Sequence, residues 1–338
     1  MENKAKYLVP GDYMADPAVH VFNGKLYIYP SHDRESGIPE NDNGDHFDMK
    51  DYHVFSMETI DGPVTDHGVV LDVKDIPWAG RQLWDCDCTC KDGKYYMYFP
   101  LKDQTDIFRI GVAVANKPEG PFIPQPDPMK GSYSIDPAIL DDGDGNYYMY
   151  FGGLWGGQLQ RYKNNKALEC AEFPADNEPA IPSRIAKLAD NMLEFAEEPR
   201  PVVILDKDGK PLTAGDNNRR FFEASWVHKY NGKYYMLSSG CTGWDPNAAE
   251  IAVADSIMGT WKTIGNPCTG LDADKTFYAQ STYVQPVIGK KDAYIAMFDR
   301  WKKKDLEDSR YVWLPVLVKD GKITIPWHEK WTLSIFDK

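Results

Sequence analysis

Long hydrophobic runs are missing from this sequence of 338 residues: no stretch of apolar residues approaches the roughly 20 that a membrane-spanning helix needs. The first four residues, Met-Glu-Asn-Lys, also begin no apolar segment of the kind found in secretory signals. We therefore expect no membrane partner. The chain as given is expected to be cytoplasmic, or periplasmic or secreted if a signal peptide has been removed.

Positive charge is outweighed by negative charge, with 38 Lys and Arg residues against 51 Asp and Glu residues. The formal net charge is −13, and the longest basic run consists of the three lysines at 302–304. A surface of this charge repels the phosphate backbone of a nucleic acid, which basic patches must neutralise. A nucleic-acid partner is therefore excluded.

The six cysteines are too few for a disulfide framework in a chain of this length. Cys86, Cys88 and Cys90 alternate, so that in a strand all three side chains face one side. A zinc site would need a second Cys/His pair at ligand spacing, and the sequence offers none. Buried free thiols are the favoured interpretation, and no metal site is predicted here.

Helical periodicity is also rare. The best amphipathic candidate covers residues 183–195, within a predicted insertion at residues 161–218. Core-forming residues, in contrast, are abundant: 42% of the chain is hydrophobic and 13% is aromatic, which excludes a disordered protein. The sequence therefore predicts a folded protein built mainly from strands.

One short motif recurs through the chain, in which a glycine turn is flanked by alternating aromatic and aliphatic residues. Its copies lie at residues 22–29, 91–98, 144–150 and 230–237, with a weaker fifth at 289–298, and their turn glycines are Gly24, Gly93, Gly145, Gly232 and Gly289. Asn-Gly and Asp-Gly supply the positive φ angles of a tight hairpin, so each copy marks two antiparallel strands. Five such units predict an all-β fold, a five-bladed β-propeller that forms a single domain over residues 1–338.

Three acidic residues occupy one repeat-equivalent position. Asp16, Asp136 and Glu223 each lie eight or nine residues before the turn glycine of their unit. The innermost strands of a propeller line its central channel, so equivalent positions on different blades meet at one end of the axis. We therefore expect these three carboxylates to converge, although they are far apart in the sequence.

Converging carboxylates suit the cleavage of glycosidic bonds. One protonated carboxyl group gives a proton to the leaving oxygen, and one ionised carboxylate activates water. A third carboxylate nearby raises the pKa of the acid by like-charge repulsion. A single Asp-Pro pair is more often a turn initiator than a catalytic site, but three acids in register across the repeats favour catalysis.

The sequence around these acids resembles glycoside hydrolase family 43. The motifs are Tyr13-Met-Ala-Asp-Pro-Ala18, Ser134-Ile-Asp-Pro-Ala138 and Phe221-Phe-Glu-Ala-Ser-Trp226, and the resemblance covers nearly the whole chain. It implies an inverting enzyme on a five-bladed propeller. It also implies that Asp16 is the general base, that Asp136 tunes the pKa of the acid, and that Glu223 is the general acid.

Different parts of the chain resemble different branches of that family. Residues 1 to about 237 are most similar to β-xylosidases and α-L-arabinofuranosidases. The final third, with Ser239-Gly-Cys-Thr-Gly-Trp-Asp-Pro-Asn247, is similar to exo-β-1,3-galactanases. Recombination or design would produce such a mixture of branches. Trp84-Asp-Cys-Asp87 departs from the usual Trp-Ala-Pro, and Tyr278-Ala-Gln-Ser281 stands where xylosidase-like members carry histidine. Both changes are expected to face the channel, where they bear on the substrate, a bound calcium or the activity.

Further residues are candidates for substrate binding. Trp84 and Trp155, near predicted blade ends, could stack on sugar rings, although packing between blades is an equal alternative. Arg310 could hold a sugar hydroxyl or pair with the catalytic carboxylates, against the alternative of a surface ion pair. For His46 and His53, a structural or surface role is favoured over a role as ligands.

The expected function is the release of terminal xylose or arabinofuranose from plant-cell-wall oligosaccharides by an exo-acting, inverting hydrolase. Trimming of β-1,3-galactan is an alternative enzyme function, and a catalytically impaired glycan-binding propeller is a third. No cofactor is expected to be required, and a structural calcium in the central channel is the one metal that the resemblance leaves open. The sequence does not predict an oligomeric state.

Overall fold

The computed structural model describes most of the chain. The described residues are 12, 14–164, 166–215, 223–243, 245–300, 302, 304–306, 310–319 and 321–337. Tyr13, Phe221 and Phe222, which belong to the motifs around the predicted acids, lie outside them. The helices of the described part are short 3₁₀ helices: η1 (Val73–Asp75), η2 (Trp155–Gly157), η3 (Leu159–Arg161), η5 (Ala273–Tyr278) and η7 (Leu333–Phe336).

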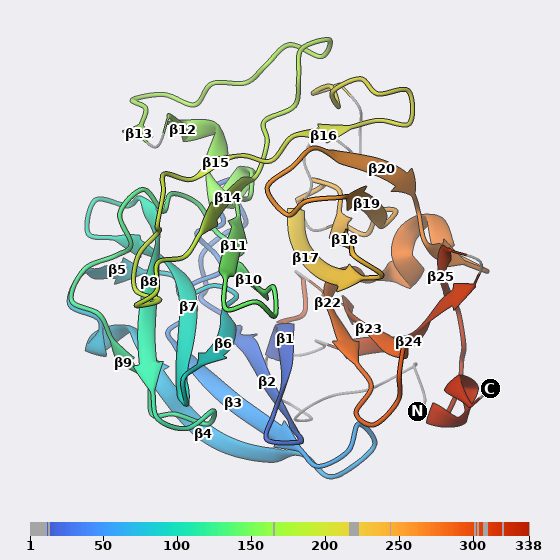
Figure 1. Cartoon of the computed structure of the whole chain (residues 1–338). Coiled ribbons are helices and arrows are strands. Elements are labelled where there is room, and N and C mark those ends of the chain that lie inside the picture. The colour runs from blue at the N-terminus through green and yellow to red at the C-terminus, as the bar shows by residue number, and fades with distance from the viewer. Residues whose placement is uncertain are drawn as a thin grey trace.

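The strands of the described residues form five blades around a common axis (Figure 1). Blade 1 contains β1 (Met14–Phe22), β2 (Lys25–His32), β3 (Asp51–Met57) and β4 (Thr65–Asp72). Blade 2 contains β6 (Asp87–Lys91), β7 (Lys94–Asp103), β8 (Phe108–Ala115) and β9 (Ile123–Pro124), with β5 (Ala79–Arg81) paired to β7. Blade 3 contains β10 (Ala138–Asp141), β11 (Tyr147–Phe151), β14 (Arg184–Lys187) and β15 (Arg200–Pro201).

The last two blades also have five strands each. Blade 4 contains β17 (Glu223–Tyr230), β18 (Lys233–Ser239), β19 (Glu250–Ala254), β20 (Trp261–Gly265) and β16 (Ile204–Leu205). Blade 5 contains β22 (Gln280–Pro286), β23 (Tyr294–Arg300), β24 (Arg310–Lys319), β25 (Lys322–Pro326) and β21 (Cys268–Thr269). A small hairpin of β12 (Tyr162–Lys163) and β13 (Lys166–Ala167) lies outside the blades, at the top of Figure 1.

The innermost strands close into a ring. Strand β1 contacts β6, and β6 contacts β10. In turn, β10 contacts β17, β17 contacts β22, and β22 contacts β1. Each inner hairpin turns at the glycine predicted for it, with φ between 73° and 87° at all five positions. The predicted all-β, five-bladed propeller is therefore confirmed, and the starts of the five inner strands lie at one end of the ring.

Two blade edges contain a parallel pair of strands, unlike the antiparallel hairpins that the repeated motif predicts. Strand β16 pairs parallel to β20, and β21 pairs parallel to β25. In both cases the chain runs along the outer edge of a blade before it crosses to the innermost strand of that blade. The added strand covers backbone groups that an open edge would expose.

The predicted insertion at residues 161–218 is wrong in its extent. Strands β14 and β15 lie within it but are the third and fourth strands of blade 3. The amphipathic candidate at residues 183–195 forms no helix, since it contains β14 and irregular backbone after that strand. Its apolar residue Ile185 is buried in the core between blades 3 and 4, and Leu188 and Met192 are buried in the core between blades 2 and 3.

Apolar side chains fill the spaces between neighbouring blades. Tyr150 and Trp261, for example, pack between blades 3 and 4, and Ile251 and Leu314 pack between blades 4 and 5. This packing fixes the inner strands relative to one another.

Among the described residues, no helix is long and apolar enough to cross a membrane. The compartment of the protein stays a prediction.

Candidate active site

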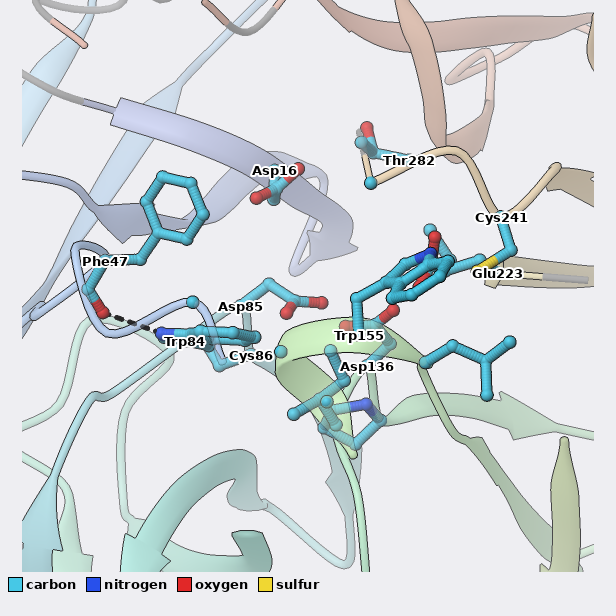
Figure 2. Close-up of a pocket in the computed structure, with 18 of the residues that line it drawn as sticks. Asp16, Phe47, Trp84, Asp85, Cys86, Asp136, Trp155, Glu223, Cys241 and Thr282 are labelled. Carbon is cyan, nitrogen blue, oxygen red and sulfur yellow. Dashed lines mark hydrogen bonds between the residues drawn. The ribbon is translucent and has the colours of Figure 1, made fainter. Parts of the chain in front are cut away.

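A cavity of about 550 Å³ lies where the inner strands begin. Every blade contributes to its wall: Asp16 from β1, Asp85 just before β6, Asp136 just before β10, Glu223 at the start of β17 and Thr282 from β22. Figure 2 shows these side chains around one common space. The structure thus brings together the three acids predicted from the sequence, although they come from three different blades.

Irregular backbone geometry places the acids at the cavity wall. Asp16 (φ 47°) and Asp136 (φ 58°) both have left-handed backbone conformations, although each precedes a proline. The pairing of β1 with β2 shifts register around Asp16. The pairing of β17 with β18 shifts between Glu223 and Trp226, where Ala224 also has a positive φ of 47°. Such β-bulges re-aim side chains and are common next to active sites.

Glu223 has the environment of a general acid. Its side chain is buried, with the residue 6% exposed. Burial raises its pKa to about 8, a hydrogen bond from the backbone N–H of Leu154 lowers it in part, and the negative charge of Asp85 raises it. A carboxyl group with this pKa is protonated at neutral pH, as a proton donor must be.

Asp136 is hydrogen-bonded to a carboxyl group that is not among the residues predicted from the sequence, that of Asp85. Burial raises the pKa of Asp85 to about 6, although the hydrogen bond from Asp136 opposes the rise. Burial, followed by the charges of Asp85 and Glu223, raises the pKa of Asp136 well above its ordinary value. The pair therefore holds one proton and one negative charge near neutral pH.

A sequence signal for Asp85 exists. It lies eight residues before Gly93, at the same repeat-equivalent position as the three predicted acids. The same count in blade 2 therefore identifies Asp85 as a further acid of the cavity wall. In Figure 2 its side chain lies between those of Asp16 and Asp136.

Asp16 has a carboxylate neighbour of its own, Asp299 near the end of β23. The backbone N–H of Asp16 donates to Oδ2 of Asp299 at 2.9 Å, and Asp299 is fully buried. Burial and then the charge of Asp299 raise the pKa of Asp16 well above its ordinary value, and burial raises the pKa of Asp299 to about 8. The two groups titrate as a unit, so Asp16 can accept a proton when the pair carries a negative charge.

The predicted substrate-binding residues lie in different places. Trp84 and Trp155 both line the cavity. Trp84 is only 8% exposed, because its indole N–H donates to the carbonyl oxygen of Phe47 at 2.8 Å (Figure 2) and its ring packs against Phe108. Arg310 begins β24 and is not among the described residues that line the cavity.

Oxygen donors for a cation lie beside the cavity. Oδ1 of Asp16 and Oδ1 of Asp299 are buried and have no hydrogen-bond partner among the described residues. A buried carboxylate oxygen without a partner is costly, and calcium binds groups of such oxygens. These two oxygens are of the type that calcium binds, but they are fewer than the six to eight ligands that it takes, so the described residues alone do not complete a calcium site.

Comparison with known proteins agrees with this site. The model of the family described as glycosyl hydrolases family 43 matches residues 14–270. The chain is 78% identical over 260 residues to a xylosidase/arabinosidase of Bacteroides ovatus, and the aligned region covers 77% of this chain and 79% of that protein. It is 51% identical over 288 residues to a β-xylosidase of Xylanibacter ruminicola, covering 85% of this chain and 84% of that protein.

Solved structures give the same result. The structure of the RS223 β-xylosidase has a TM-score of 0.83 and 56% identity, and covers 96% of this chain and 98% of that chain, so the likeness extends through most of the final third. A family 43 enzyme from Xanthomonas citri in complex with xylose has a TM-score of 0.83 and 39% identity, covering 96% of this chain and 94% of that chain. A β-1,3-galactosidase of the family, at 24% identity and a TM-score of 0.74, shows the fold alone. The chain belongs to glycosyl hydrolase family 43.

Proposed function

We propose that this protein is an exo-acting, inverting glycoside hydrolase that releases terminal xylose or arabinofuranose from plant-cell-wall oligosaccharides. One observation carries the proposal: Glu223, with its pKa raised to about 8, lines the same cavity as the carboxyl groups of Asp16 and Asp136. Glycoside cleavage with inversion requires a group that gives a proton and another that takes one.

Each acid has a proposed role. Glu223 donates its proton to the oxygen of the leaving sugar, and Asp16 removes a proton from the attacking water. The Asp85–Asp136 pair places a negative charge near Glu223, which keeps the acid protonated between turnovers. For inversion we expect the carboxyl groups of Asp16 and Glu223 to lie roughly 6.5–9.5 Å apart, because a water molecule must fit beside the anomeric carbon.

The size and wall of the cavity support a small terminal sugar. A volume of about 550 Å³ is that of a small-molecule pocket. Trp155 and the edge of Trp84 offer apolar surface to a sugar ring, while a role for Arg310 stays a prediction. A pentose is favoured because similar proteins are named xylosidase/arabinosidase, and because similar structures contain xylose or xylotriose.

Hydrolysis of nitrophenyl glycosides tests the proposal. The β-xyloside and the α-L-arabinofuranoside are expected to be cleaved, and proton NMR of the first xylose released is expected to show the inverted anomer. Cleavage of the β-galactoside instead would support trimming of galactan. Binding of xylo-oligosaccharides without any cleavage would support a glycan-binding propeller.

We also propose that no organic cofactor is needed and that a calcium ion binds beside Asp16 and Asp299. One similar structure, of an enzyme from a compost microbial metagenome, is described as a calcium-free form. Treatment with EDTA is expected to lower the melting temperature, and CaCl₂ is expected to restore it. A melting temperature and an activity that respond to neither would contradict the calcium site.

A further inference from the structure

His32, Asp51 and His53 form a compact group on blade 1, and none of them lines the catalytic cavity. Asp51 and His53 are two residues apart on β3, so their side chains leave the same face of the sheet. Tyr52 between them is fully buried. His32 ends the neighbouring strand β2, and the antiparallel register of the two strands, continued to the end of β2, places it opposite Asp51.

The ligand atoms of this group are close enough together for one metal ion. One atom from each residue lies within 4.8 Å of the others. Nδ1 of His32 is 2.6 Å and Nε2 of His53 is 3.8 Å from Oδ1 of Asp51. Tetrahedral zinc with ligands at about 2.0–2.2 Å separates them by about 3.3–3.5 Å, so small side-chain rotations suffice. The three side chains are 15–23% exposed, which leaves access for an ion and for water.

Further carboxylates orient both histidines from behind. Nε2 of His32 lies 3.1 Å from Oδ1 of Asp12, and Nδ1 of His53 lies 3.1 Å from Oδ1 of Asp66. Metal-bound histidines almost always donate their second ring N–H to a carboxylate or carbonyl, which fixes the ring and raises its basicity. This second layer is an observation independent of the spacing of the three inner residues, and it is present for both rings.

We propose that His32, Asp51 and His53 bind a divalent transition-metal ion, with zinc as the best match, and that Asp12 and Asp66 orient the two histidines. Two imidazoles and one carboxylate are ligands that zinc accepts, with water in the fourth position. Calcium and magnesium prefer oxygen ligands throughout, so this site differs in chemistry from the carboxylates of the catalytic cavity. A bound ion would join β2 to β3, and the contact of His32 with Asp12 would extend this link to Asp12.

The same contacts could serve as a chain of hydrogen bonds that stabilises blade 1 without binding metal. Titration calorimetry separates the two. The full-length protein is freed of metal with EDTA, desalted, and titrated with ZnCl₂ in the presence of excess CaCl₂, which occupies oxygen-only sites. We expect one zinc ion to bind per chain.

Variants assign that binding to the proposed residues. His53→Ala is expected to weaken zinc binding at least tenfold, and Asp66→Asn is expected to weaken it about 10- to 100-fold through the lost orientation of His53. His67→Ala, on β4 of the same blade and bonded to Ser56 instead, is the matched control and is expected to leave the affinity unchanged. Circular dichroism checks the fold of each variant.

Two results would overturn the proposal: no zinc uptake by the parent protein, or uptake that His53→Ala and Asp66→Asn leave unaltered. Should His53→Ala fail to fold, Asp66→Asn decides alone, because the side chain of Asp66 is 43% exposed and its replacement leaves the core untouched.

Discussion

At the scale of single residues, a general acid matters most when the leaving group is poor. A sugar alkoxide needs a full proton to depart, whereas a nitrophenolate needs little. Glu223→Gln is therefore expected to lower kcat on xylobiose by about 10²- to 10⁴-fold and to lower kcat on nitrophenyl xyloside far less. Steady-state kinetics on the two substrates check this. Equal losses on both would show that Glu223 is not the acid.

The hydrogen-bonded pair of Asp85 and Asp136 leads to a second prediction. Since the pair holds one proton and one negative charge, replacing either member with asparagine leaves one negative charge beside Glu223. Either single variant is expected to shift the alkaline limb of kcat/KM on xylobiose by only a few tenths of a pH unit. The double variant Asp85→Asn/Asp136→Asn is expected to move that limb to lower pH by about one unit, because the pKa of Glu223 then loses the charge that raises it.

A pH profile of the four proteins measures this coupling directly. If Asp136→Asn alone moves the limb as far as the double variant does, then Asp136 tunes the acid without help from Asp85. The overall loss of kcat is a separate quantity, since Asp136 can also hold the substrate or the acid in position.

The acids differ in how visible they are in the sequence. Asp16, Asp136 and Glu223 are predictable because each lies eight or nine residues before a turn glycine, and bulges in β1 and β17 expose two of them. Asp85 obeys the same rule, and counting in blade 2 finds it. Asp299 does not follow this rule, because it lies on β23, the second strand of its hairpin. Only the folded ring brings that strand against Asp16.

At the scale of elements, the loop after β11 positions the acid. Gly153 exchanges hydrogen bonds with the hydroxyl of Ser134, and the next residue, Leu154, donates its N–H to Glu223. A Cβ atom on Gly153 would lie 2.7 Å from the side chain of Ile135 and 3.2 Å from Oε1 of Glu223. The position therefore requires glycine for close approach rather than for an unusual φ.

Gly153→Ala is expected to push the loop away from Glu223 and to lower kcat at least tenfold, while overpacking lowers stability by about 1–3 kcal/mol. Kinetics together with thermal unfolding measure the two effects. Adding Ile135→Ala removes one of the two clashes, so the double variant is expected to regain room for the loop while the contact with Glu223 remains. Full recovery of kcat in the double variant would show that the contact with Ile135 alone displaces the loop.

Elements without a clear repeat are harder to predict. The hairpin of β10 and β11 is recognisable from its turn, but β14 and β15 are short and are separated from it by a long connection, so they carry no local signal. Their positions depend on pairing within the folded blade, where β14 pairs with β11 and β15 pairs with β14. The apolar residues at helical spacing in 183–195 are buried in the folded propeller and do not form one face of a helix. The parallel edge strands β16 and β21 are also too short to give a signal in the sequence.

At the scale of the whole molecule, the ring of inner strands links residues from both ends of the described chain. Strand β1 contacts β22, and Tyr311 of β24 donates a hydrogen bond to the carbonyl oxygen of Met14. We propose on this ground that residues 1–338 act as one catalytic domain. No single blade contains the site, because the acids of the cavity come from different blades and meet only when the ring is closed.

Gathering carboxyl groups in one buried space makes the stability of the whole fold depend on pH. The folded pKa of Glu223 is raised to about 8, above its ordinary value of 4.5, so between these values the folded protein binds a proton that the unfolded chain does not. The free energy of unfolding therefore falls as pH rises through this window, by at most about 1.4 kcal/mol per pH unit for each such group.

Glu223→Gln removes this loss of stability and is expected to be more stable than the parent at pH 8, by on the order of 1–3 kcal/mol, with the difference shrinking toward pH 5. Urea unfolding in EDTA at the two pH values measures it, and Glu58→Gln, whose side chain is 77% exposed, is the control expected to change stability by less than about 0.5 kcal/mol at either pH. A Glu223→Gln protein that is equally destabilised at both pH values would mean that the carboxyl group of Glu223 is solvated in the folded state, and that the cavity does not hold it protonated.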